Sequence, residues 1–510
     1  MENSSRTQNA SRNLAVATIC QVVNLALNFA LRTFFVKFLG SEYLGVNGLF
    51  SNILSLLSFA ELGIGNAIVF NLYKPLVKGD REEIKSILGL YKKAYTIIAI
   101  IVTVAGLAVI PFLDLFIKNP PQIAENLITI YLLFLAGSVL SYVNVYKLSL
   151  LIADQKNYIV LIGNEIFHVI QLVLQIAILY VWQSFIYFLL VQVICTFLSN
   201  LFLSRYTTHL YPYIKAKEQP LPKERKLSIF RDVKALAYYK FGSILLNSTD
   251  NILVSSFIGL SSVGIVSNYV LLHQACNSIL GKIMDSFSAS IGNLHVTATP
   301  KDKYEIFNRI LLLVVWAYGF ASVGIIVVSD YLIDNWLGSF YVLDINTVTA
   351  IIAGFFITGV HAVLSTFRNS MGFFTAGRFA PLLAAIMNLT LSIILCKKLG
   401  LLGIYMATPI ARVCTLGIID AYIIFKRGFN VSPFLYFIKS AYYVIIIVAS
   451  GFLCRFIISS YIPATWTGVI LSIIIVSVVY NGIMLLFQYR TKEFKGLLLM
   501  AKSIINAKKS

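Results

Sequence analysis

About fourteen apolar stretches, each about 20 residues or longer, follow one another between Asn13 and Gln488. A helix needs about 20 residues to cross a bilayer, whose hydrocarbon core tolerates no unpaired backbone polar group. A hydrophobic fraction of 58% and a charged fraction of 12% leave no room for a sizeable water-soluble domain. The sequence therefore predicts an all-α polytopic membrane protein. The expected spans lie near residues 13–37, 44–72, 90–112, 124–150, 157–181, 184–204, 240–258, 264–294, 308–329, 346–367, 379–396, 402–425, 438–458 and 466–488.

Basic residues gather in alternate gaps between these spans, which accounts for the net charge of +19. If the N-terminus is cytoplasmic, 33 of the 41 Lys and Arg residues lie on the cytoplasmic side, 5 lie outside and 3 lie within spans. This split follows the positive-inside rule and needs no nucleic-acid partner. We therefore expect a multi-pass membrane protein with both termini in the cytoplasm.

Motifs of soluble enzymes are missing from the sequence. It has no phosphate-binding glycine loop, no HExxH and no GxSxG, and the longest outer loop is near 330–345. The six cysteines lie in or beside apolar spans and never pair as CxxC, so we expect small apolar side chains rather than disulfides or metal ligands. The sequence thus predicts no enzyme activity, no cofactor and no metal site.

An internal repeat divides the chain. Residues 38–45 close the first span and open the second, and residues 257–264 do the same for spans seven and eight, 219 positions later. This pattern predicts two pseudo-symmetric six-helix lobes, joined by a cytoplasmic linker and followed by two further helices. Parallel repeats of this kind suit a transporter whose lobes rock about a central cavity. The expected boundaries are 1–206, 207–232, 233–430 and 431–510.

Polar residues form stripes along several spans. In span one Gln21, Asn24, Asn28 and Arg32 recur at steps of 3, 4 and 4, which places them on one helix face. Hydrogen bonding between helices explains scattered Ser and Asn, but a charge at the bilayer centre costs about 3 kcal/mol or more. We therefore predict a water-filled cavity lined by spans one, two, seven and eight. The expected substrate-binding residues are Arg32, Asn28, Asn24, Lys282, Asn277, Asp285 and Asn247.

Some of these charges have a second interpretation. Arg32 lies in the outer third of its helix, where its side chain can also extend outward to the membrane surface. Lys282 is about one turn from Asp285, so an internal ion pair competes with anion binding. Arg412 faces either the cavity or a packing contact. The histidines of the spans, His168, His273 and His361, lack ligand spacing and are expected to be structural.

Two blocks of sequence resemble a known family. Residues 59–67 read FAELGIGNA and residues 72–76 read LYKPL, similar to the second helix of bacterial flippases for lipid-linked oligosaccharides. A second block, from Arg368 to Gly403, and the Thr249-Asp250-Asn251 tripeptide are similar to the same family. These flippases form the polysaccharide-transporter branch of the MOP (multidrug/oligosaccharidyl-lipid/polysaccharide) superfamily. Where relatives often carry Asn near the end of span ten, this chain has His361.

The resemblance implies a two-lobed molecule that moves undecaprenyl-pyrophosphate-linked repeat units outward by alternating access. Its products would be capsule, O-antigen or exopolysaccharide, and its partners membrane lipids, the polysaccharide polymerase and the export machinery. Arg32 corresponds to a cavity arginine of the related peptidoglycan-precursor flippases, and arginine grips pyrophosphate through two parallel hydrogen bonds. Two other readings stay open: a drug/cation antiporter of the same superfamily, and a membrane glycan polymerase or ligase.

Coupling to Na⁺ or H⁺ is a further expectation, because relatives in this superfamily often use an ion to reset the empty carrier. Asp250 on span seven, Asn388 on span eleven and Thr408 on span twelve offer the hard oxygen ligands that sodium prefers. Asp250 or Glu61 would instead carry a proton. The alternative for Asp250 is hydrogen bonding between neighbouring helices.

Overall fold

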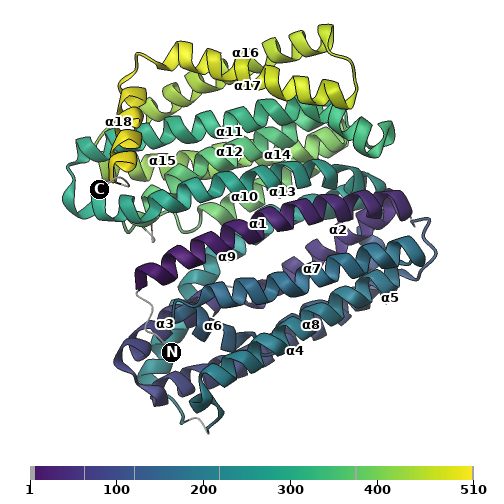
Figure 1. Cartoon of the computed structure of the whole chain (residues 1–510), viewed down its shortest axis with the longest axis vertical. Helices are drawn as coiled ribbons and strands as arrows, with labels where there is room; N and C mark the ends of the chain where they lie inside the picture. Colours follow the sequence, from purple (N-terminus) through teal and green to yellow (C-terminus); the bar gives the residue numbers. More distant parts are fainter. Residues whose placement is uncertain (1–5, 62–63, 120, 217–218, 374–375, 508–510) are drawn as a thin grey trace. The chain divides into compact units, whose positions relative to one another are not determined.

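The computed structural model describes residues 6–61, 64–119, 121–216, 219–373 and 376–507, and these are almost entirely helical, with no β-strand among them (Figure 1). The predicted all-α class is confirmed. The chain divides into two compact units, Met1–Gly264 and Ile265–Ser510. The lobe boundaries expected from the repeat stay a prediction.

The first unit contains nine α-helices among the described residues, and a tenth begins there. They are α1 (Arg6–Phe38), α2 (Gly40–Leu57), α3 (Ile64–Lys78), α4 (Arg81–Val109), α5 (Leu127–Ser141), α6 (Val145–Ala153), α7 (Asn157–Val181), α8 (Phe185–Leu210), α9 (Lys223–Phe257) and α10 (Leu260–Thr297). Short 3₁₀ turns interrupt them at η1 (Ser58–Glu61), η2 (Ile110–Phe116) and η3 (Pro212–Lys215).

The second unit continues along α10. Its other helices are α11 (Pro300–Leu337), α12 (Ile345–Ser370), α13 (Ala380–Leu399), α14 (Leu401–Arg412), α15 (Ile418–Ile423), α16 (Phe434–Tyr461), α17 (Trp466–Gln488) and α18 (Lys492–Ala507). A 3₁₀ turn, η4 (Ser339–Tyr341), precedes α12. Two π-helical turns, η5 (Val413–Gly417) and η6 (Ile424–Phe429), flank α15, so span twelve is one distorted helix.

Ten helices among the described residues are long and apolar enough to cross a membrane, and the bent pair α5–α6 makes eleven. The three remaining predicted spans correspond to the broken helix α2–α3, to α9 and to α10. These are three of the four spans whose polar stripes predict a cavity lining. All three contain polar residues, and α2–α3 is also interrupted at Ser58–Glu61, so the count of fourteen stays a prediction consistent with the fold.

Both turns of the internal repeat place a glycine at a positive φ angle. Gly40 and Gly259 have φ angles of +84° and +142°, a region that favours glycine. Each turn ends one long helix and begins the next, at α1–α2 and at α9–α10.

The helices that follow these turns touch each other in a reciprocal way. A Cβ atom on Gly45 would lie 2.0 Å from the carbonyl oxygen of Leu260, and one on Gly264 would lie 2.0 Å from that of Ser41. Leu260 and Gly264 occupy the repeat positions of Ser41 and Gly45. The start of α2 and the start of α10 therefore cross with local two-fold symmetry, as a duplicated helix pair would, and glycine permits the close approach.

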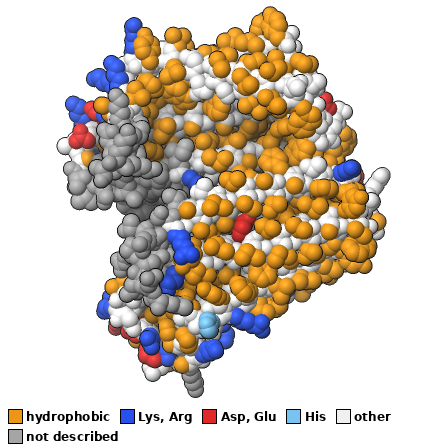
Figure 2. All heavy atoms as spheres, in the orientation of Figure 1, with side chains coloured by type: hydrophobic (Ala, Val, Ile, Leu, Met, Phe, Trp, Pro, Cys, Tyr) orange, Lys and Arg blue, Asp and Glu red, His pale blue; other side chains and the backbone are white. Residues whose placement is uncertain are grey.

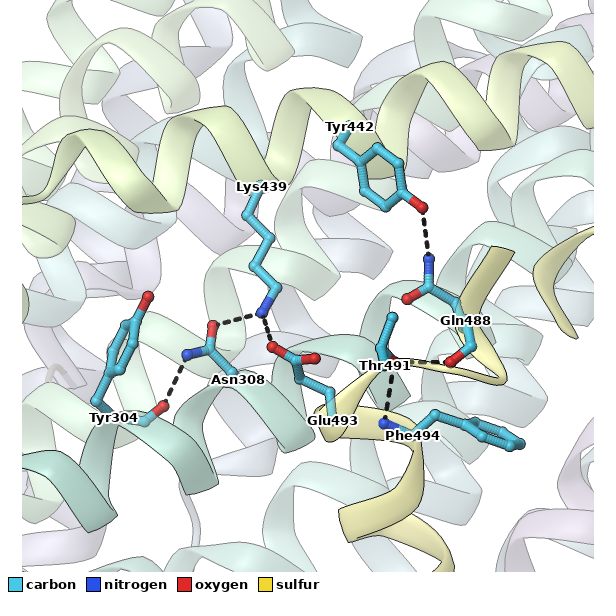
Figure 3. Close-up of polar contacts among 8 residues, drawn as sticks. All are labelled: Tyr304, Asn308, Lys439, Tyr442, Gln488, Thr491, Glu493 and Phe494. Carbon is cyan, nitrogen blue, oxygen red and sulfur yellow. Dashed lines mark hydrogen bonds and ion pairs between the residues drawn. The ribbon is translucent and has the colours of Figure 1, made fainter. Parts of the chain in front are cut away.

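In the second unit, α11 packs against α12, α16, α17 and α18. Figure 3 shows how α18 is attached: Lys439 of α16 donates to Asn308 of α11, at 3.0 Å, and to Glu493 of α18. The Thr491 hydroxyl accepts from the amide of Phe494, at 3.3 Å, and caps the helix. The C-terminal helix is therefore fixed to the ends of two spans.

The surface has the character of a membrane protein. On the face in Figure 2 hydrophobic side chains predominate over most of the helices, whereas Lys and Arg lie mainly towards the edges. Exposed large side chains such as Phe452, Phe456 and Ile474 lie on predicted spans. An exposed apolar surface of this extent fits lipid rather than water.

Candidate functional site

The predicted stripe of α1 meets a parallel neighbour, α7. Near the start of both helices the amide of Tyr158 donates to Asn13 Oδ1 at 2.7 Å. Further along, Asn24 Nδ2 donates to Glu165 Oε2 at 2.6 Å. The two helices run side by side in the same direction (Figure 1). Asn24, one of the expected binding residues, therefore faces an acidic side chain on the next helix.

Glu165 is a residue that the sequence analysis missed. Its second oxygen, Oε1, is buried and has no hydrogen-bond partner among the described residues. Cys20 and His168 lie within range of its charge. A carboxylate inside an apolar span is a functional candidate by itself, so its position in span five was the available signal. Asn24, Glu165 and His168 thus form a polar cluster between α1 and α7.

The α1 stripe continues beyond Asn24 with Asn28 and Arg32. Asn28 Nδ2 donates to the carbonyl of Asn24, one turn back, at 2.7 Å. Arg32 is half-buried and follows one turn further along the same face. The stripe thus combines one arginine with three amides, Gln21, Asn24 and Asn28, on a single helix.

Two other polar residues of α7, Asn164 and Gln175, bond to the next helix, α8. Gln175 is 1% exposed and donates to the carbonyl of Phe188 at 3.1 Å. The Ser199 hydroxyl donates to Asn164 at 2.9 Å. Both bonds hold α7 to α8, so these two side chains serve helix packing.

Glu61 lies where the predicted second span breaks, in η1 between α2 and α3. It shares a hydrogen bond with the Tyr95 hydroxyl, and Tyr142 lies within range of its charge. Tyr142 in turn donates to Ser58 at 3.0 Å. The expected continuous helix over 44–72 is therefore wrong, because the chain turns at 58–61. The turn places the Glu61 carboxylate beside Tyr95 of α4 and near Tyr142, which follows α5.

A polar cavity of about 310 Å³ lies beside this break, within the first unit. Hydroxyl and amide side chains account for much of its lining. They include Ser51, Ser55, Ser58, Ser138, Gln192 and Thr196. Ser51, Ser55 and Ser58 come from the segment of predicted span two, and the lining contains no charged residue among those described.

In the second unit, α13 and α14 bring two of the expected ion ligands together. Thr408 donates to Asn388 Oδ1 at 3.2 Å, and Ser392 lies 3.3 Å from the same oxygen. Asn388 is fully buried. Asp250, the third expected ligand, belongs to α9 of the first unit and is half-buried. The structure therefore groups Asn388 and Thr408, and the role of all three stays a prediction.

A second cluster in this unit, around Asp420, was not predicted as a group from the sequence. Asp420 is fully buried and accepts from Arg368 Nη1 at 2.6 Å. Its other oxygen lies 2.9 Å from His361 Nε2. The interpretation of His361 as structural fits this position, because it completes a buried ion network between α12 and α15.

The remaining expected residues lie on α9 and α10. Asn277 is exposed and accepts from the Tyr318 hydroxyl of α11 at 2.9 Å. Lys282 is half-buried. The side chains of Asn247 and Asp285 lie outside the described residues, so the alternative of a Lys282–Asp285 ion pair stays open.

The chain was compared with known proteins by sequence and by fold. No family model and no curated protein matches the sequence. Among solved structures, the chain is similar to the lipid II flippase MurJ in an inward closed conformation. The identity is 17% over 93% of this chain and 98% of that chain, with a TM-score of 0.65.

Multidrug transporters show the same likeness. An inward-facing multidrug resistance MATE family transporter of the MOP superfamily is 14% identical, over 81% of this chain and 97% of that chain, with a TM-score of 0.65. The MATE multidrug transporter DinF-BH, in complex with R6G, is 16% identical over 83% and 97%, with a TM-score of 0.57. The protein is thus a multi-pass membrane protein. Its fold is similar to that of the lipid II flippase MurJ and of MATE multidrug transporters.

Proposed function

We propose that this protein flips undecaprenyl-pyrophosphate-linked oligosaccharide repeat units across the bacterial cytoplasmic membrane by alternating access. The flipped units would supply capsule, O-antigen or exopolysaccharide assembly, with the polymerase and export machinery as downstream partners. In this proposal the chain is a carrier and performs no covalent chemistry. The fold shared with a lipid II flippase supports a lipid-linked substrate.

One observation carries the proposal. Among the described residues, the predicted spans outside the set long and apolar enough to cross a membrane are α2–α3, α9 and α10, three of the four helices expected to line a hydrated path. Polar residues inside a span are costly unless they face water or each other. A lipid-linked sugar needs such a path for its hydrophilic head, while its tail stays in the lipid.

The fourth of these helices, α1, carries a positive charge that suits a pyrophosphate. Arg32 is the only basic residue within α1 between Arg12 and Lys37, and it follows Asn24 and Asn28 on one face. A guanidinium binds two phosphate oxygens at once, and the amides add donors for sugar hydroxyls. The hydroxyl-lined cavity beside η1 offers similar neutral partners.

A drug/cation antiporter is the second candidate, and Glu165 favours it. A buried carboxylate oxygen without a hydrogen-bond partner among the described residues is suited to an organic cation or an exchanged proton. Two further solved structures with this fold are described as multidrug transporters. The two candidates differ in the sign of the charge that the cargo carries.

Ion coupling belongs to the same proposal. Asn388 and Thr408 share a hydrogen bond and present oxygen atoms, and Asp250 would add the ionised ligand that sodium requires. Glu61 and Glu165 are the rival proton carriers. Transport driven by an imposed Na⁺ or H⁺ gradient, compared between the parent, Asp250→Asn and Glu61→Gln, distinguishes these ions.

Depletion in the native host tests the function. We expect loss of the protein to trap lipid-linked repeat units in the cytoplasmic leaflet and to leave sensitivity to organic cations unchanged. Arg32→Ala should reproduce the block at a normal protein level, whereas Arg455→Ala, a half-exposed arginine paired with Asp330, should not. Cells that export polymer normally but accumulate organic cations would favour the antiporter.

A further inference from the structure

A cationic cavity lies within the first unit, away from the clusters described above. Its volume is about 560 Å³, and it is bounded by α4, α6, the η3 turn and the start of α9. No Asp or Glu is found among the described residues that line it. Its lysines are Lys85, Lys92, Lys93, Lys147, Lys215 and Lys226. This set is called the lysine pocket below.

The lysines repel one another across this space. Lys147 lies within range of the charges of Lys92 and Lys215, and its ammonium donates to the Thr208 hydroxyl at 3.2 Å. Lys85 pairs with Glu82 at 2.7 Å, and that acid is not part of the described lining. Positions 217 and 218, outside the described residues, are one lysine and one glutamate, so they leave the formal charge unchanged. A polyanion in the pocket would relieve this repulsion.

One side of the pocket begins with a fixed segment, 211–215. The Tyr211 hydroxyl donates to Asp154, which also pairs with Lys156 at 2.7 Å. Burial and this hydrogen bond raise the pKa of Tyr211, so the phenol stays a neutral donor. The Arg81 guanidinium lies 5.4 Å from the centre of the Tyr213 ring. These contacts hold Lys215 against the ends of α4 and α6.

The start of α9 is fixed as well. Arg225 Nε donates to Glu83 of α4 at 3.0 Å, and its Nη2 reaches the carbonyl of Asn71 at 3.4 Å. Leu221, which lines the pocket, is 7% exposed and anchors the segment that leads into the helix. The lysines therefore come from four separate, restrained elements and not from one mobile tail.

We infer that the lysine pocket is a binding site for a phosphate-bearing polyanion. Several ammonium groups around one concave space suit a ligand with two or more phosphoryl charges, for which lysine acts as a point charge. The volume lies in the range of small-ligand sites. Lys85, Lys215 and Lys226 belong to segments that the sequence predicts to be cytoplasmic, and Lys92, Lys93 and Lys147 lie within about one turn of the cytoplasmic ends of predicted spans. The inference does not depend on which molecule is transported.

Two sources supply this chemistry at the cytoplasmic surface. One is the headgroup of an anionic phospholipid, because basic pockets between membrane helices on this side bind such headgroups. The other is a soluble di- or polyphosphate, of which a nucleotide is an example. The shared feature is the phosphoryl charge, so the experiment uses one probe for each source.

The test measures the thermal unfolding midpoint (Tm) of the full-length purified protein in neutral detergent. The probes are inorganic pyrophosphate, a short-chain phosphatidylglycerol and, as a neutral comparison, a phosphatidylcholine of the same chain length. The variant is Lys92→Gln/Lys147→Gln/Lys215→Gln. The matched control is Lys301→Gln/Lys397→Gln/Lys398→Gln, which removes three exposed lysines elsewhere.

We expect pyrophosphate or phosphatidylglycerol to raise Tm in the parent and in the control, with phosphatidylcholine inactive. The pocket variant should bind at least about tenfold more weakly, since each lysine near a phosphate surface contributes roughly fivefold. A response to pyrophosphate alone identifies a soluble ligand, and a response to phosphatidylglycerol alone identifies a headgroup. An equal response in the pocket variant, or no response of the parent to either anion, would overturn the inference.

Discussion

Asp420 in the second unit and Glu165 in the first are both carboxylates inside predicted membrane spans, yet their surroundings differ. Both oxygens of Asp420 are bonded, one to Arg368 and one to His361, and the side chain is fully buried. Glu165 has one bonded oxygen, to the neutral Asn24, and one without a hydrogen-bond partner among the described residues.

This difference separates two uses of buried charge. An acid whose two oxygens both have partners holds helices together, and removing one partner is strongly destabilising. An acid with a spare oxygen and a neutral partner keeps the capacity to take up a proton or a cation. We therefore assign the Asp420 network to architecture and the Glu165 cluster to function.

The largest expected effect follows from breaking the Asp420 network. Asp420→Asn leaves Arg368, 3% exposed, as an uncompensated charge, which should cost about 3–5 kcal/mol of stability. The unfolding midpoint in detergent and the yield of monodisperse protein report this loss. The double variant Asp420→Asn/Arg368→Met should recover much of it, because no buried charge is left unpaired.

Asp330→Asn is the control for that experiment. Asp330 pairs with Arg455 at 3.9 Å, and both side chains are partly exposed, so the change should be small. If Asp420→Asn unfolds at the same temperature as the parent, the architectural role assigned to the network is wrong.

Glu165→Gln should affect transport and leave stability nearly unchanged. Glutamine keeps the shape and an oxygen that Asn24 can donate to, but it removes the ionisable group. We expect pH-dependent transport in proteoliposomes to become flat with pH, while the unfolding midpoint shifts by only a few degrees at most. Asn164→Ser, at the neighbouring position, is the control. An unaltered pH profile in Glu165→Gln would remove the carboxylate from the mechanism.

The smallest effect concerns a third acid, Glu493, in the contact drawn in Figure 3. Burial alone would raise its pKa, but the hydrogen bond and charge of Lys439 hold the pKa below its usual 4.5. Because the pKa is lower in the folded state, the stabilisation is full above about pH 4.5 and is lost as pH falls below it. The pair is partly exposed, so we expect about 1 kcal/mol or less.

A spin label on α18 measures this third effect. Its mobility should increase on acidification in the parent, and Glu493→Gln should show the more mobile state at neutral pH. A label that is equally immobile in the parent and in Glu493→Gln at every pH would show that the Trp316–Phe494 stacking alone holds the helix.

Sequence reasoning reached the class of the molecule because membrane insertion acts on composition and length, which the chain displays directly. The repeat turn was also visible in the sequence, because Gly40 and Gly259 both adopt the positive φ angle that favours glycine. The break at Ser58–Glu61 was not predicted, because apolar and polar residues there continue a helical pattern.

Pairings between helices were harder to predict. Asp420 and Glu165 were visible as charges within spans, but their partners, Arg368 and Asn24, come from other helices. Periodicity shows which face a residue occupies and not which helix lies opposite. Asn388 and Thr408 were predicted as oxygen ligands of an ion together with Asp250. The structure joins the first two by a hydrogen bond, and the ion site stays a prediction.

The most direct test of the account is flipping by the purified protein. Proteoliposomes would contain a fluorescent polyprenyl-pyrophosphate-linked saccharide, and a membrane-impermeant quencher would report the fraction in each leaflet over time. The account predicts rapid redistribution by the parent and by Arg455→Ala, partial activity with Arg32→Lys, and loss with Arg32→Ala. Redistribution by Arg32→Ala at the parent's rate would contradict the assignment of the α1 stripe as the path of the pyrophosphate.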